Sequence, residues 1–225
     1  MSADTLSTNN DTWGAGVQAR RPHHAGTATL STNNDTKERI LDAAVGIVLE
    51  KGFSGVGINE ILKAVNVPKG SFYHWFASKE QFGVELLRYF GRQALSYMRK
   101  WLEKKETLPN AYERLIAFHE AKISSLIEHD CQQVCLVGKL TAEVSSWSES
   151  MRRQVAENTS EVIALLRQVI EEGQAQGSIR QTVDAAQAAG VIHDVWQGAS
   201  LRSTTQVQAQ PAREALAFIK TYLAP

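Results

Sequence analysis

Residues 67–80, VPKGSFYHWFASKE, combine several groups that can bind anions. Ammonium, phenol, hydroxyl and backbone N–H groups all bind phosphate oxygens, and side chains of this kind also reach base edges. The candidate contact residues are Lys69, Gly70, Ser71, Tyr73, His74 and Lys79. A helix of about two turns cannot bury all of its faces, so we predict that Phe72 and Phe76 anchor it in a core. Tyr73 and His74 then point outwards, where they can contact phosphate.

The flanking residues predict the helices that position this stretch. A first amphipathic helix starts at a capping box formed by Asp35 and Glu38 and ends at Gly52, which suits a left-handed C-cap. Residues 58–65 have the apolar spacing of a second helix of about two turns. The tripeptide Asn-Val-Pro at 66–68 ends that helix, and its proline suits the start of the next one.

Two short helices joined by a tight turn and braced by longer helices form a helix-turn-helix, whose second short helix reads DNA. Gly70 permits close approach of the backbone to DNA, and the free N–H groups at this helix start favour phosphate. Lys79 lies beside a second capping box, Ser78 and Gln81, which begins a long helix. We therefore expect double-stranded DNA as a partner. A dimer would read a near-palindromic operator.

Apolar residues recur at helical spacing from Pro109 to the C-terminus, and no convincing alternating strand is found. We expect an all-α fold of about nine helices. Residues 1–35, rich in Ser, Thr, Asn and Gly, are expected to form a disordered leader. The helix-turn-helix domain is expected over 36–84 and a second helical domain over 85–225. The octapeptide TLSTNNDT occurs at 5–12 and again at 29–36, and nothing in the sequence explains this repeat.

Composition limits the possible classes of protein. The 225 residues include 24 basic and 24 acidic side chains, so any DNA site must be local. Two cysteines are too few for a secreted disulfide framework, and neither a signal peptide nor an apolar run of about eighteen residues is present. We expect a cytoplasmic protein with no membrane partner. Signatures such as Gly-x-Ser-x-Gly, the P-loop and the dinucleotide fingerprint are absent, so we expect no enzyme.

The segment TKERILDAAVGIVLEKGFSGVGINEILKAVNVPKGSFYHWFASKEQF, within residues 36–84, strongly resembles the DNA-binding domain of the TetR family of bacterial transcriptional regulators. This resemblance implies a homodimeric repressor with a C-terminal ligand-sensing domain, which leaves its operator when a small-molecule inducer binds. It also implies dimerisation through the last two long helices, about 183–204 and 211–223. The small residues Ala185, Ala189 and Ala199 would permit close packing, either between subunits or within one.

A second segment, VCLVGKLTAEVSSWSESMRRQV at 134–155, resembles the subgroup of this family that controls N-ethylmaleimide reductase and acrylate detoxification. The resemblance implies that Cys135 senses reactive electrophiles or oxidants. The chemistry agrees, because a helix N-terminus or a cation lowers a thiol pKa, and Lys139 follows one turn later. Alternatively, Cys135 is a small buried residue. The protein would then control efflux or catabolic genes through a reversible ligand.

Four further residues are candidates for a ligand pocket between helices: His119, Trp147, His193 and Trp196. Lone histidines in apolar stripes are more often satisfied core residues. His129, Cys131 and Cys135 do not match a zinc-site spacing, so we expect neither a metal nor another cofactor. Cys131 is a more plausible disulfide partner for Cys135.

Overall fold

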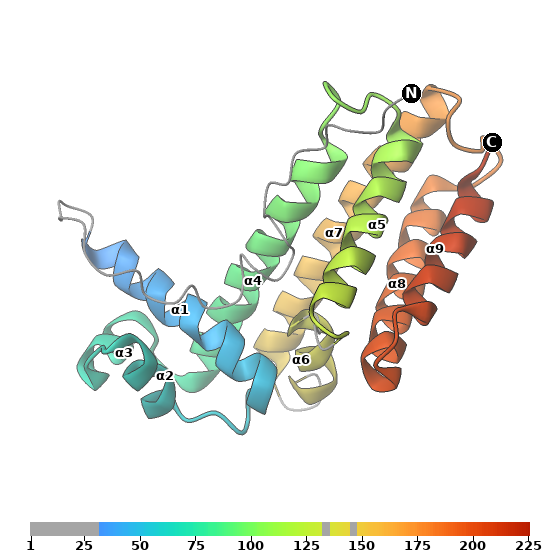
Figure 1. The fold of residues 1–225 in the computed structure, drawn as a ribbon. Helices are drawn as coiled ribbons and strands as arrows, with labels where there is room; N and C mark the ends of the chain where they lie inside the picture. Colours follow the sequence, from blue (N-terminus) through green and yellow to red (C-terminus); the bar gives the residue numbers. More distant parts are fainter. Residues whose placement is uncertain (1–31, 132–135, 145–147) are drawn as a thin grey trace.

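The computed structural model describes residues 32–131, 136–144 and 148–225, and all regular structure in these ranges is helical (Figure 1). The helices are α1 (Thr32–Lys51), α2 (Ile58–Val65), α3 (Lys69–Trp75), α4 (Lys79–Leu102), α5 (Ala111–Glu128), α6 (Leu136–Val144), α7 (Glu149–Ala175), α8 (Ala185–Gln206) and α9 (Gln210–Leu223). The expected all-α fold is confirmed. Most of the expected leader, 1–35, lies outside the described residues.

The N-terminal unit consists of α1, α2, α3 and the first turns of α4. Helix α1 begins at Thr32, before the expected N-cap at Asp35, because polar and acidic residues are also favourable within a first turn. It ends where Gly52 adopts a φ of 78°, as its sequence predicts. Asn66 caps α2 in the left-handed conformation, with a φ of 53°. Pro68 is the N-cap of α3 and not its first residue.

Helix α4 joins this unit to the rest of the molecule. The Ser78 hydroxyl accepts a hydrogen bond from the Gln81 N–H at 3.0 Å, so the expected cap is present. The first turns of α4 contribute Phe82 and Leu86 to the core of the N-terminal unit, whereas Met98 and Leu102 belong to a second core. The expected domain boundary after residue 84 therefore lies inside a helix that both cores share.

The C-terminal bundle consists of α5, α7, α8 and α9, packed against the far part of α4 (Figure 1). Helix α4 packs along α7, α7 along α8, and α8 along α9. The short helix α6 lies below the bundle and contacts α1, α4 and α7. No helix within the described ranges is long and apolar enough to cross a membrane.

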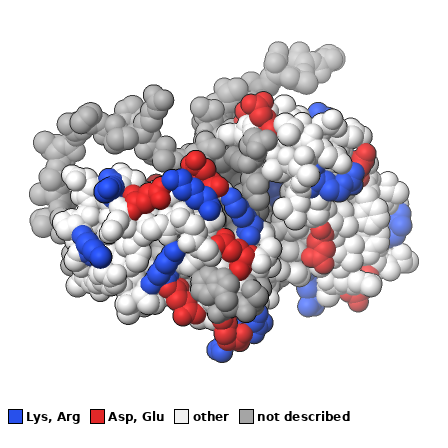
Figure 2. Space-filling view, turned by 90° about the horizontal axis from the view of Figure 1, so that it is seen from below, with Lys and Arg blue, Asp and Glu red and all other residues white. Residues whose placement is uncertain are grey.

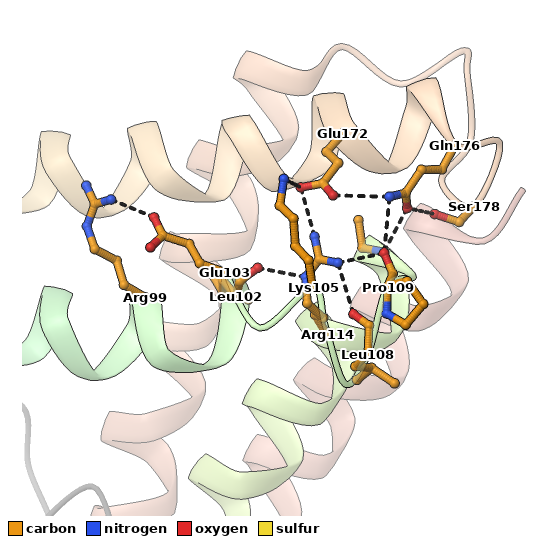
Figure 3. Close-up of polar contacts among 11 residues, drawn as sticks. Arg99, Leu102, Glu103, Lys105, Leu108, Pro109, Arg114, Glu172, Gln176 and Ser178 are labelled. Carbon is orange, nitrogen blue, oxygen red and sulfur yellow. Dashed lines mark hydrogen bonds and ion pairs between the residues drawn. The ribbon is translucent and has the colours of Figure 1, made fainter.

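A buried arginine holds the connection between α4 and α5 (Figure 3). The Arg114 guanidinium donates to the carbonyl oxygens of Leu102 at 2.7 Å, Leu108 at 3.0 Å and Pro109 at 2.7 Å. It also forms an ion pair with Glu172 on α7 at 2.8 Å, and its side chain is fully buried. One side chain therefore satisfies three backbone acceptors, and the Pro109 carbonyl oxygen also accepts a hydrogen bond from Gln176 Nε2 at 3.1 Å.

Arg114→Ala should lower the free energy of unfolding by about 2–4 kcal/mol, because it leaves the carbonyl groups of Leu102 and Leu108 without their buried donor and takes one of two cationic partners from the partly buried Glu172. Lys105→Ala is the matched control. Lys105 pairs with the same Glu172 at 3.1 Å, but its side chain is 61% exposed, so its loss should cost about 0–1 kcal/mol. Urea unfolding followed by circular dichroism measures both values, and equal losses would contradict this assignment.

Candidate nucleic-acid interface and ligand cavity

Helix α3 presents one apolar and one exposed face. Phe72 and Phe76 are fully buried, and each packs on Phe82 of α4, with ring centroids 5.3 and 5.1 Å apart. Tyr73 is 51% exposed, and His74 is also exposed. The structure thus divides the aromatic residues of α3 as the sequence predicts, with half of them fixing the helix and the others available at the surface.

The first turn of α3 is open to solvent. Lys69 and Gly70 are exposed, and Ser71 is partly exposed. A Cβ added at Gly70 would meet no atom within 4 Å, so nothing inside the protein requires glycine at this position. The absence of a side chain there suits close approach by a partner, although the contact itself remains a prediction.

Lys79 lies beside the turn between α1 and α2. Its ammonium group donates to the Ser54 carbonyl oxygen at 3.2 Å and lies 5.2 Å from the centroid of the Phe53 ring. An ammonium group has three donors, so one bond to Ser54 leaves capacity for a phosphate. On the face of the molecule that Figure 2 shows, basic and acidic side chains are interspersed and do not form one continuous basic surface.

A cavity of about 120 Å³ lies between α4, α5, α7 and α8. Most of its lining is apolar, from residues such as Phe90, Met98, Phe118, Leu166 and Ile192. His119, His193 and Trp196 all line it, so the structure brings together three of the predicted pocket residues. Among the described residues of the lining, none is acidic.

The imidazole of His119 is neutral. Burial, with a smaller contribution from the positive charge of Lys122, lowers the pKa of His119 to about 3. Its Nδ1 lies 2.8 Å from the Leu115 carbonyl oxygen. Nδ1 must therefore carry the proton and donate it, which leaves Nε2 as an acceptor. The ring packs edge-on against Trp196, with centroids 4.7 Å apart.

Lys122 is a pocket residue that sequence reasoning missed. Its Nζ lies 4.4 Å from the Trp196 ring centroid and 5.2 Å from that of Phe118, within the range of cation–π attraction. Lys122 follows His119 by three residues on α5, and this spacing indicates that both side chains lie on the same face of the helix. Asn158, which also lines the cavity, carries no such signal in the sequence.

Of the remaining sensing candidates, Lys139 does not line this cavity. Cys135 and Trp147 lie outside the described residues. Lys139 donates from Nζ to the backbone carbonyl oxygens of Leu49 and Glu50 at the end of α1. Cys131 is a buried free thiol, 5% exposed.

The outer face of α8 and α9 carries exposed apolar side chains. Leu201 is 50% exposed and Phe218 is 46% exposed, and a shallow groove between the two helices includes Gly198, Pro211 and Phe218. Ala189 and Ala199 are buried within the protomer. The large apolar side chains exposed on this face are therefore Leu201 and Phe218, whereas Ala199 lines the groove but is itself only 7% exposed.

An exposed α3 in a helix-turn-helix, joined to a helical bundle with an internal cavity, is the architecture of a class of DNA-binding transcriptional regulators. Residues 40–86 match the bacterial regulatory proteins of the tetR family, and residues 111–219 match the C-terminal domain of tetracycline repressor-like proteins. The chain belongs to the TetR family of transcriptional regulators, as its sequence predicts.

Relatives support this placement. The chain is 35% identical over 194 residues to the HTH-type transcriptional repressor NemR of Escherichia coli (strain K12), covering 86% of this chain and 96% of NemR. It is 29% identical over 202 residues to the transcriptional regulator AcuR of Cereibacter sphaeroides, covering 90% and 88% of the two chains. The crystal structure of the reduced form of E. coli NemR superposes with a TM-score of 0.75 at 33% identity, covering 84% of this chain and 98% of NemR.

The neutral His119 predicts a pH dependence of stability. The unfolded chain binds a proton at this residue near pH 6.5, whereas the folded chain does so only near pH 3. The free energy of unfolding should therefore fall as the pH drops below about 6.5, with this residue contributing up to ~1.4 kcal/mol per pH unit. In His119→Asn that contribution disappears. Urea unfolding between pH 6.5 and 4 should give a shallower dependence than in the wild type.

The exposed His74 offers a matched control for this measurement. His74→Asn should leave the pH dependence of the wild type unchanged. Parallel curves for the wild type and His119→Asn would show that His119 is not a buried neutral imidazole.

Proposed function

We propose that this protein is a homodimeric transcriptional repressor that binds a near-palindromic operator through α3 and the start of α4. A reactive electrophile or oxidant releases it from the DNA by modifying Cys135. The observation that carries the DNA-binding part is the exposed surface of Lys69, Gly70 and Tyr73 on a helix anchored by buried phenylalanines. The match to a repressor over most of both chains supports the same interpretation.

Operator binding would combine contacts to the DNA backbone, which position the protein, with contacts to base edges, which recognise the sequence. Lys69 and Lys79 bind phosphates, Tyr73 and His74 add hydrogen bonds to the backbone, and the exposed first turn of α3 faces base edges. A second subunit would cover Leu201 and Phe218 on α8 and α9. The resulting two-fold symmetry places two copies of α3 on one face of the duplex, which is why the operator is expected to be near-palindromic.

The sensing part of the proposal rests on the resemblance around Cys135 and on one relative. The solved structure of E. coli NemR is described as a reduced form, so a change of oxidation state is relevant to that protein. A thiolate adds to an activated carbon–carbon double bond through a new carbon–sulfur bond, and water supplies the proton to the adjacent carbon. Such a step needs no further co-reactant.

The cavity supports a second candidate, a reversible inducer. Its volume of about 120 Å³ is close to that of engineered apolar cavities that bind benzene. A ligand built around one ring would therefore fit. The ammonium of Lys122 favours a neutral or anionic compound over a cation, and the acceptor Nε2 of His119 favours a compound that carries a hydrogen-bond donor. In this version Cys135 is structural, and the regulated genes serve efflux or catabolism.

Alanine at Lys69 and Tyr73 should weaken operator binding about ten-fold or more. The slope of log K against log[salt] should become shallower by about two units in a dimer, because each protomer loses one phosphate contact. Fluorescence anisotropy with DNA from the protein's own promoter measures both. Lys105→Ala removes a lysine near the far end of the bundle and should bind as the wild type does. Unchanged affinity in the double variant would remove α3 as the DNA-reading helix.

One equivalent of N-ethylmaleimide should lower the operator affinity of the wild type many-fold, and Cys135→Ser should bind DNA normally without this response. Cys131→Ser is the matched control and should respond as the wild type does, since its thiol is buried. Anisotropy titrations before and after modification measure the effect. Tight binding by the wild type that N-ethylmaleimide leaves unaltered would argue for the reversible inducer in the cavity instead.

A further inference from the structure

Two side chains of α6 bind the end of α1 and the turn that follows it. The ammonium of Lys139 donates to the carbonyl oxygens of Leu49 and Glu50. These acceptors belong to the last turn of α1, where carbonyl groups lack partners within the helix and a cation is favourable. One turn later on α6, Glu143 accepts hydrogen bonds from the backbone N–H groups of Phe53, at 2.9 Å, and Ser54, at 2.5 Å.

The Glu143 carboxylate is fitted closely to this turn. A Cβ added at Gly52 would lie 3.2 Å from Glu143 Oε2, so the backbone passes close to the carboxylate. Burial raises the pKa of Glu143, but hydrogen bonds from Ser54 and Phe53 and the charge of Lys139 outweigh it and hold the pKa below its ordinary value. The carboxylate is therefore ionised at neutral pH and holds two consecutive amides.

The same two turn residues hold Lys79. The carbonyl oxygen of Ser54 accepts a hydrogen bond from Lys79 Nζ, and the face of Phe53 lies 5.2 Å from that ammonium. Glu143 thus binds the amide side of a peptide segment whose carbonyl group and ring bind Lys79. The contacts form a continuous series from α6, through the turn, to the first residue of α4.

A separate contact between the two halves provides a comparison. The carboxylate of Glu80, next to Lys79, accepts hydrogen bonds from the hydroxyl groups of Ser148 and Ser150, both at 2.6 Å. This contact joins the starts of α4 and α7 directly. It does not involve the Phe53–Ser54 turn. Its loss therefore tests whether removing any hydrogen bond between the N-terminal unit and the C-terminal bundle affects DNA binding to the same extent.

We propose that Glu143 is a positioning residue for the DNA contact of Lys79: by fixing the Phe53–Ser54 turn, it sets where the Lys79 ammonium meets a phosphate. A shift of α6 would then change a DNA contact without any change in α3. This inference rests on the DNA-binding function proposed above and extends it to a residue of the C-terminal half, about sixty residues along the chain from Lys79.

Glu143→Gln tests the proposal, because the Phe53 and Ser54 amides bind different carboxylate oxygens, and the nearly isosteric glutamine replaces one of these oxygens by an NH2 group that cannot accept. Operator binding should weaken about ten-fold near 0.15 M salt. The slope of log K against log[salt] should become shallower by about two units per dimer. Lys79→Ala should show the same two changes, and the double variant should lose no more than either single variant. Fluorescence anisotropy over a range of KCl concentrations measures the operator affinity and the salt slope of Glu143→Gln, Lys79→Ala and the double variant.

Ser150→Ala is the control for loss of a hydrogen bond between the halves, and it should keep the salt dependence of the wild type. Thermal unfolding verifies that Glu143→Gln remains folded. A wild-type salt slope in Glu143→Gln, or additive losses in the double variant, would overturn the positioning role while leaving DNA binding intact. Failure of the wild type itself to bind promoter DNA would instead reject the proposed function, and this inference with it.

Discussion

The close packing of α4 on α7 is the constraint on which the rest of the structure depends. A Cβ at Gly83 would lie 2.6 Å from the Phe53 ring and 2.7 Å from Met151, and one at Gly91 would lie 2.5 Å from Asn158. A larger residue at Gly83 would have to displace the Phe53 ring or the end of the Met151 side chain, and one at Gly91 would have to displace the Asn158 amide. The Asn158 amide then donates to the Leu87 carbonyl oxygen at 2.9 Å and fixes the register of the two helices.

This packing makes α4 common to both hydrophobic cores, so the two halves of the molecule cannot move as unconnected units. Gly91 and Asn158 also line the cavity, which places a bound ligand directly against the α4–α7 contact. At the start of α4, Lys79 donates a hydrogen bond to the turn after α1, and Glu80 accepts one from Ser148 at the N-cap of α7. The helices α4 and α6 therefore connect the bundle physically to the surface proposed to bind DNA.

Local chemistry is predictable from the chain alone. The caps at Gly52 and Ser78 and the end of the second helix at 66–68 are recognisable in the sequence, because capping and helix-breaking residues act on groups within four positions of themselves. The inward direction of Phe72 and the outward direction of Tyr73 follow from helical geometry. The sequence places the start of α1 too late, since polar residues suit either an N-cap or a first turn. From the sequence, Lys139 is expected to be a cation near Cys135. Nothing in the sequence indicates the hydrogen bonds that Lys139 donates to the end of α1.

By itself, the sequence determined the helices, the family and the exposed residues of α3, because these depend on periodicity and on contacts between near neighbours. Only the tertiary structure decided which distant polar groups meet. Arg114 pairs with Glu172, Lys122 faces Trp196, and Glu143 binds the turn after α1. Such pairs depend on the angles and separations at which helices pack. These packing angles and separations are set by the sum of many apolar contacts. They therefore leave no local pattern in the amino-acid sequence.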